Sequence, residues 1–166
     1  MGKDYRVFDT VEGLGNAKDG EVSFTGKKLF NTDFDRESDL EAYICANIEW
    51  FCDALGEKYI SHETNKPIVK RLRMSPQVRR VDMYIKCRGS VLIVELKNPS
   101  SGTESRAAIG QVLDYGRGFT DTRKKQMVIV TTKFDQPTAK TIKHYNLPIR
   151  YIYMSKRQIM EFLCEQ

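Results

Sequence analysis

The stretch VLIVELK, residues 91–97, is the feature that most restricts how this chain can fold. Residues 91–94 are all apolar and rich in Val and Ile, which is typical of a strand buried on both faces of a sheet. Glu95 and Lys97 follow at once and, being two residues apart, project from the same face of that strand. A buried strand is therefore predicted to end with a carboxylate beside an ammonium group.

The preceding segment, VRRVDMYIKC, is predicted to pair with this strand as a hairpin. A two-residue turn can be formed by residues 88–89 or by residues 89–90. The first turn places Asp82 directly opposite Glu95, and the second places Asp82 opposite Lys97. In either register the three charged side chains share one face of the hairpin.

The rest of the chain alternates between helix and strand patterns. Apolar residues recur at helical spacing over residues 34–56. Further elements are expected in the following order: a helix over 103–119, a strand over 126–134, a helix over 136–146, a strand over 148–154 and a final helix from Ser155. A hairpin followed by strands joined through helices predicts an α/β fold with a mixed sheet flanked by helices. We interpret residues 1–35 as an N-terminal extension, β-rich and packed on the core, and residues 36–166 as the main domain.

Composition narrows the class of protein. The chain has 166 residues, of which 40% are hydrophobic and 30% charged, as in an ordinary globular domain. Its apolar runs fall short of the roughly 18 residues that span a bilayer, and its start lacks the apolar stretch of a signal peptide. We therefore expect a cytoplasmic protein, or a nuclear one in a host with a nucleus. The four cysteines form no CxxC pair and are expected to be buried free thiols, with a disulfide or zinc site as the alternative.

Positive charge is concentrated in the segment KPIVKRLRMSPQVRR, residues 66–80. This segment holds six basic residues and no acidic one, within a chain of net charge +5. It fits either a solvated basic face or a surface for a polyanion such as nucleic acid. Charge alone leaves both interpretations open.

The pairing of Asp82 with Glu95 predicts a metal site. Two carboxylates that face each other in an apolar setting repel and lose hydration, and a divalent cation between them removes both costs. Carboxylate oxygens suit Mg²⁺ or Mn²⁺. Lys97 alongside could orient or deprotonate a water and stabilise charge on a phosphate. The alternative is a buried Glu95–Lys97 ion pair that merely ends the strand.

These residues, in this order, resemble the PD-(D/E)XK nuclease superfamily, whose restriction-endonuclease-like core has the element order αβββαβ. Asp82 in RRVD and Glu95 with Lys97 in VELK match the motif, although Val81 stands where the name of the superfamily has Pro. The segments look most similar to those of archaeal mismatch endonucleases and Holliday-junction-resolvase-like members. The resemblance covers roughly residues 36–131.

The resemblance implies a role for each residue of the motif. Asp82 and Glu95, with the backbone carbonyl of Leu96, would bind Mg²⁺, for which Mn²⁺ could substitute. The family often adds an acidic residue from the first helix. Glu37 is favoured for this role, and Glu41 is held in reserve.

Residues outside the motif are expected to complete the site. Gln111 matches a Gln that the family often carries on the helix after the motif, and its amide could bind a metal-bound water or a phosphate. Contacts with nucleic acid are expected from five residues: Lys70, Arg73, Arg79, Arg80 and Tyr115.

The resemblance therefore implies a divalent-metal-dependent nuclease that hydrolyses phosphodiester bonds, with a DNA endonuclease favoured over an enzyme that acts on RNA. No membrane partner is expected, and a homodimer remains open. One alternative is a catalytically silent nucleic-acid-binding module with the same fold. Another is a protein whose basic face docks on a protein partner, with the carboxylates serving only as ion pairs.

Overall fold

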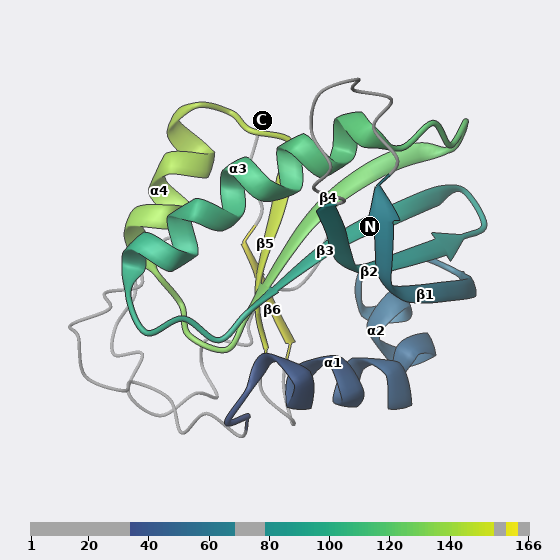
Figure 1. Cartoon of the computed structure of the whole chain (residues 1–166), viewed down its shortest axis with the longest axis horizontal. Helices are drawn as coiled ribbons and strands as arrows, with labels where there is room; N and C mark the ends of the chain where they lie inside the picture. Colours follow the sequence, from purple (N-terminus) through teal and green to yellow (C-terminus); the bar gives the residue numbers. More distant parts are fainter. Residues whose placement is uncertain (1–33, 69–78, 155–158, 163–166) are drawn as a thin grey trace.

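The computed structural model describes residues 34–68, 79–154 and 159–162, which form one six-stranded sheet with helices on both faces (Figure 1). Residues 1–33 of the N-terminal extension lie outside the described part of the chain, and so do Lys70 and Arg73. The elements are α1 (Glu37–Ala46), α2 (Ile48–Ala54), β1 (Tyr59–Ile68), β2 (Arg79–Cys87), β3 (Ser90–Lys97), α3 (Gly102–Gly118), β4 (Lys124–Thr131), α4 (Gln136–His144), β5 (Ile149–Met154) and β6 (Ile159–Phe162).

The strands lie in the sheet in the same order as in the sequence, β1 to β6. Neighbours from β1 to β3 are antiparallel, β3, β4 and β5 are parallel, and β6 is antiparallel to β5. The fold is therefore the mixed α/β sheet that the sequence predicts. From α1 to β4 the order is helices, three strands, a helix and a strand, which matches αβββαβ with the first helix in two pieces.

The β2–β3 hairpin adopts the first of the two predicted registers. β2 ends at Cys87 and β3 begins at Ser90, so residues 88–89 form the turn. The paired residues run from Lys86 opposite Val91 to Met83 opposite Val94. This register places Asp82 and Glu95 at equivalent positions just beyond the last pair.

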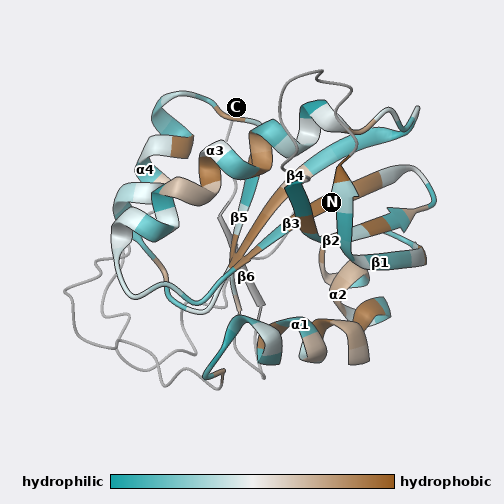
Figure 2. Cartoon of the chain, viewed as in Figure 1, coloured by the Kyte–Doolittle hydropathy of each residue, from teal (hydrophilic) through white to brown (hydrophobic). Residues whose placement is uncertain are grey.

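Two layers of apolar side chains hold the helices to the sheet. Figure 1 shows α3 and α4 on one face and α1 and α2 on the other. Odd-numbered residues of β3, such as Val91 and Ile93, pack with Ala108 and Val112 of α3. Even-numbered residues of β3 pack with Leu40 of α1 and other residues of the first two helices. The middle stretches of β3 and β4 are correspondingly apolar in Figure 2, as expected for strands covered on both faces.

The helix expected over residues 34–56 is interrupted at Asn47. Asn47 leaves the helical conformation, with φ −126° and ψ 34°, and both its backbone N–H and its side-chain amide donate to the carbonyl of Tyr43, at 3.2 and 2.9 Å. The chain ends α1 there and starts α2 at Ile48. Gly56 has a φ of +76° just after α2, as the C-terminal glycine of a helix commonly does.

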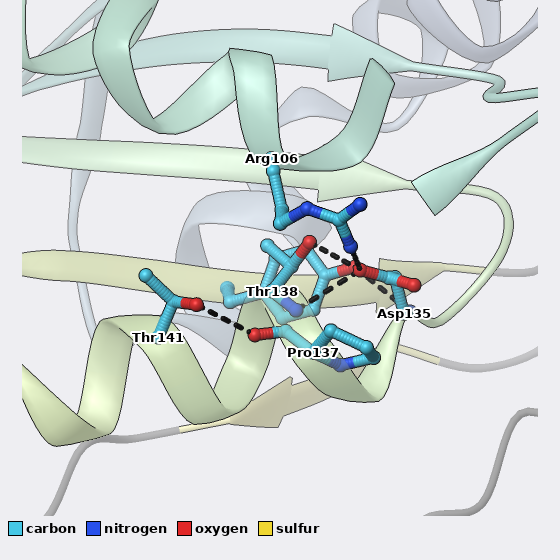
Figure 3. A network of polar contacts seen from close by, with 6 residues as sticks. Arg106, Asp135, Pro137, Thr138 and Thr141 are labelled. Atoms are coloured by element: carbon cyan, nitrogen blue, oxygen red, sulfur yellow. Dashed lines mark hydrogen bonds and ion pairs between the residues drawn. The ribbon is translucent and has the colours of Figure 1, made fainter. Parts of the chain in front are cut away.

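α4 begins at a buried polar network, drawn in Figure 3. The carboxylate of Asp135 accepts a hydrogen bond from the backbone N–H of Thr138 at 2.9 Å and caps the helix. Arg106 of α3 approaches the same carboxylate at 3.7 Å. The cap therefore also fixes α4 beside α3.

Two expectations about secondary structure differ from the observed fold. β1 occupies residues that the sequence analysis did not assign, because its side chains are mostly exposed and polar. The final helix predicted from Ser155 is wrong where the chain is described, since Ile159–Phe162 pairs with β5 as a strand. Edge pairing overrides the helical spacing of apolar residues in this segment.

Cys45, Cys52 and Cys87 are free thiols, and burial raises the pKa of each. The prediction of buried free thiols is confirmed for Cys52 and Cys87, whereas Cys45 is half-buried and Cys164 lies outside the described residues. None of the helices in the described part of the chain is both long enough and apolar enough to cross a membrane.

Candidate active site

The site lies where β2 and β3 separate. Their pairing ends at Met83 and Val94, although β2 extends back to Arg79 and β3 continues to Lys97. Over Arg79 and the two residues after it, β2 remains paired with β1. The sheet therefore opens into a fork between β2 and β3, and Asp82 and Glu95 stand at its base.

Each of the two carboxylates has one oxygen engaged by the protein. Asp82 Oδ2 accepts a hydrogen bond from the backbone N–H of Leu96 at 2.7 Å. Glu95 Oε1 lies 2.8 Å from Lys97 Nζ in an ion pair. Glu95 Oε2 is buried and accepts no hydrogen bond from the described residues. This oxygen is left free to bind a ligand.

The electrostatics of the pair follow from burial and like charge. Glu95 is 3% exposed, and burial, followed by the charge of Asp82, raises its pKa to about 7 against the opposing effect of Lys97. Burial alone would lower the pKa of Lys97, but its hydrogen bond with Glu95 and the negative charges around it raise that pKa. Lys97 is therefore held as an ammonium ion.

α1 brings both of its candidate carboxylates towards the fork, from the face opposite α3. Glu41 is half-buried, and its pKa is raised by burial and then by the charge of Asp82. Glu37 is exposed, and its carboxylate accepts a long hydrogen bond of 3.4 Å from the backbone N–H of Asn98. The charge of Asp82 thus acts on Glu41, whereas Glu37 lies beside the end of β3 and its charge acts on Lys97.

α3 contributes from the other face. Tyr115 is 7% exposed, and burial, followed by the charges of Glu95 and Asp82, raises its pKa to about 12. Its phenol is therefore a protonated hydrogen-bond donor near both carboxylates. Gln111 lies one turn earlier on α3 and is half-buried, but within the described chain no hydrogen bond joins it to Asp82 or Glu95.

The two arginines at the start of β2 are exposed. Arg79 pairs with Asp114 of α3, which also accepts a hydrogen bond from Arg117 at 2.8 Å. Arg80 donates to the backbone carbonyl of Asn65 at 3.0 Å. Both side chains are thus anchored at one end of the fork while remaining accessible to solvent.

Asn98 and Asp114 were not singled out by the sequence analysis. Asn98 directly follows Lys97, and its amide bridges β3 to two other elements. Asp114 directly precedes Tyr115 and holds the arginine that starts β2. The sequence pointed to these two residues only through their position, since each is a polar residue adjacent to a predicted site residue.

In the ranges that the structure describes, no group of three or more His, Cys, Asp and Glu side chains is placed to hold a metal. The protein ligands available to a cation at the fork are the two carboxylates and a backbone carbonyl such as that of Leu96. This set fits Mg²⁺, which is usually bound by one or two carboxylates, with waters and substrate phosphates as its other ligands.

No protein-family model and no curated protein matches the sequence. Among solved structures, the small subunit R.BspD6I2 of the heterodimeric restriction endonuclease R.BspD6I is similar, with a TM-score of 0.42 and 13% sequence identity. The match covers 74% of this chain and 70% of that subunit. At this level of similarity the activity of one chain does not carry over to the other.

Proposed function

We propose that the protein is a divalent-metal-dependent nuclease that hydrolyses phosphodiester bonds in DNA. The observation that carries the proposal is the carboxylate pair at the fork. Glu95 keeps one buried oxygen without a donor from the described residues, next to Asp82 and beside the ammonium group of Lys97. A buried carboxylate oxygen that lacks a donor is costly unless a ligand satisfies it.

Asp82 and Glu95 would hold Mg²⁺ through carboxylate oxygens, with the Leu96 carbonyl as a further ligand. The hydrogen bond from the Leu96 N–H and the ion pair with Lys97 fix the two carboxylates in advance. The bound ion would polarise a phosphate oxygen and lower the pKa of a coordinated water.

Lys97 is assigned to the phosphate. Because its pKa is raised, it remains protonated and would stabilise the negative charge that develops on the phosphorus oxygens. The same raised pKa argues against Lys97 as the base that deprotonates water in the metal-free protein. It can still orient that water as a hydrogen-bond donor.

Glu41 is the residue of α1 that we assign to the site, in place of Glu37. Burial and the charge of Asp82 raise the pKa of Glu41, which is half-buried, whereas Glu37 is exposed. The Glu41 carboxylate would accept a hydrogen bond from a water at the fork. Tyr115 would donate from the opposite side, and Gln111, one turn away, remains a candidate for a contact with water or phosphate.

DNA would approach along the basic side of the fork. Arg79 and Arg80 are exposed, and Asp114 and the Asn65 carbonyl hold them in place. Guanidinium groups fixed in this way suit contacts with backbone phosphates. Lys70 and Arg73, which lie outside the described residues, stay predicted contacts with DNA. A homodimer would allow both strands of a duplex to be cut.

A cleavage assay tests the proposal. Supercoiled, linear, single-stranded and branched DNA, together with RNA, would be incubated with Mg²⁺, Mn²⁺ or EDTA. The wild-type protein should cut with either metal and not with EDTA, and Asp82→Asn and Lys97→Ala should each lose activity. Asp53→Asn, which alters an exposed ion pair with Lys58, serves as the control and should cut normally.

Absence of cleavage with every substrate and metal would overturn the proposal. If DNA then bound equally well in Mg²⁺ and in EDTA, the catalytically silent binding module would replace it. If DNA did not bind at all, the basic surface would be assigned to a protein partner.

A further inference from the structure

The side-chain amide of Asn98 joins three elements at the site. Its Nδ2 donates to the backbone carbonyl of Asp35 at 2.7 Å, just before α1 begins. Its Oδ1 accepts from the hydroxyl of Thr132, after β4, also at 2.7 Å. Asn98 itself directly follows Lys97 at the end of β3.

These two bonds fix the orientation of the amide. Its oxygen must face the Thr132 hydroxyl and its nitrogen must face the Asp35 carbonyl, because a flipped amide would set two acceptors against each other. Thr132 is in turn tied to the motif, since its backbone N–H donates to the carbonyl of Lys97 at 3.0 Å. The bridge therefore has one defined geometry.

The bridge acts on α1 at the end that carries the site residues. Asp35 lies two residues before Glu37, the first residue of the helix. Glu41 follows Glu37 by four residues and so lies on the same side of α1, about 6 Å farther along it. Anchoring the carbonyl of Asp35 to β3 therefore sets how close Glu41 comes to Asp82.

Other contacts in the described part of the chain also hold this end of α1. The ring of Phe34 is buried and packs edge-on against Tyr43, with the ring centroids 5.5 Å apart. The Asn98 N–H also contacts Glu37, at the longer distance of 3.4 Å. Apolar packing holds the helix against the sheet, and the amide bridge adds a directional hydrogen bond at the start of the helix.

We propose that Asn98 is a positioning residue, which holds the start of α1 against the end of β3 so that Glu41 stands beside Asp82 and Glu95. This rests on the proposed nuclease function for its catalytic consequence, because Glu41 acts on the substrate only if the fork is the active site. The contact between Asn98 and the start of α1, which we call the tether, does not depend on that function. A displacement of a catalytic group by about 1 Å can cost on the order of 100-fold in rate.

The test compares two Asn→Ala variants at opposite ends of the same helix. Asn98→Ala removes the bridge at the start of α1. Asn47→Ala removes a single side-chain hydrogen bond, to the Tyr43 carbonyl at the far end. Asn98→Ala should lower kcat by at least about tenfold with KM for DNA changed less than about twofold, whereas Asn47→Ala should keep kcat.

Two further comparisons separate positioning from general destabilisation. Thr132→Val removes the hydroxyl that orients the amide and should lower kcat, while Thr132→Ser keeps the hydroxyl and should restore it. Because Asn98 acts through Glu41, Asn98→Ala should lower kcat little further in a Glu41→Gln protein. Equal kcat in Asn98→Ala and wild type, or full additivity with Glu41→Gln, would overturn the proposal.

Amide hydrogen exchange makes the tether testable without any activity. Asn98→Ala should speed exchange at the amides of residues 40–43 by at least about tenfold relative to the amides of β3, and Asn47→Ala should not. If the wild-type protein cleaves no nucleic acid but this pattern is found, the nuclease function fails and the tether stands. If exchange at these amides is unchanged in Asn98→Ala, the tether itself is wrong.

Discussion

Asp82 and Glu95 are held next to each other although their charges repel. The protein offsets part of this cost through the Leu96 N–H and Lys97, yet the pKa of Glu95 still rises to about 7. Strongly shifted carboxyl groups of this kind concentrate at functional sites. At the scale of single residues, the pair is thus better explained by a ligand that it binds than by the stability of the fold.

Asp82→Asn is expected to lower the pKa of Glu95. The substitution removes the second largest cause of the shift, the charge of Asp82, while the amide oxygen can still accept from the Leu96 N–H. Burial, the largest cause, remains, so the pKa should fall from about 7 without reaching its ordinary value. A ¹³C NMR titration of the Glu95 carboxyl group in metal-free protein measures this directly.

The control for this titration is Asp53→Asn, which removes a carboxylate on the surface and should leave the pKa of Glu95 unchanged.

The raised pKa of Glu95 also makes the stability of the metal-free protein depend on pH. Folded Glu95 binds its proton more tightly than unfolded Glu95, so the free energy of unfolding falls as the pH rises from about 4.5 to about 7. This fall, on the order of 3 kcal/mol, should be smaller in Asp82→Asn; an equal or larger fall would contradict the account.

Strand periodicity and a two-residue turn were sufficient to place Asp82 on the same face as Glu95 and Lys97 without any tertiary information, and the structure shows which of the two registers is used. The sequence could not separate Glu37 from Glu41. Both follow the same helical stripe, and the distance of each from Asp82 depends on how α1 crosses the sheet. The bridge from Asn98 could not be foreseen for the same reason, since its partners are 63 and 34 residues away.

At the scale of elements, the close approach of α3 to β1 depends on Gly118. A Cβ atom built at this position would lie 2.2 Å from Cγ2 of Ile68 in β1. Gly110, by contrast, lies on an open side of the same helix, with no atom within 4 Å of such a Cβ. The end of α3 that follows Tyr115 is therefore packed against the first strand of the sheet.

Gly118→Ala should lower the free energy of unfolding by about 1–3 kcal/mol, because the added methyl group displaces Ile68 or the helix. The matched variant Gly110→Ala should instead raise it by about 0.5–1 kcal/mol, since Ala favours the helix and meets nothing. Urea denaturation of both variants measures the difference. If Gly118→Ala were neutral or stabilising, α3 would not pack against β1 as described.

β1 and β6 show which elements could not be predicted from the sequence. β1 has exposed residues at most positions, so neither alternation nor an apolar run reveals it, and its strand conformation comes from pairing with β2. β6 has apolar residues at helical spacing but pairs with β5. Strands at the edges of a sheet are specified by their neighbours more than by their own pattern.

At the scale of the whole molecule, the fork allows helices on opposite faces to reach one point. A continuous sheet would separate α1 from α3, but β2 and β3 part after the pair Met83–Val94. The charge of Asp82 consequently shifts the pKa of both Glu41 and Tyr115, which come from the two sides of the sheet. The local composition gave no sign of this opening, because it is a property of how three strands pair.

Arg80→Ala should weaken DNA binding to a similar extent for every sequence and reduce the slope of log K against log salt by about one, as expected for the loss of one phosphate contact. Arg80 is suited to this test because it is exposed and its protein partner in the described residues is a backbone carbonyl. Fluorescence anisotropy at several salt concentrations measures the slope. Lys58→Ala, which removes an exposed lysine paired with Asp53, is the control. Equal slopes for Arg80→Ala and wild type would remove Arg80 from the DNA-binding surface.

The most direct test of the central claim is a titration with Mn²⁺ followed by electron paramagnetic resonance, without any nucleic acid. The wild-type protein and Asp53→Asn should bind Mn²⁺ with equal affinity, while Asp82→Asn and Glu95→Gln should each bind at least about tenfold more weakly, because either change removes a ligand. Mg²⁺ should compete for the same site. Binding of equal strength in all four proteins would contradict the claim that Asp82 and Glu95 form a metal site.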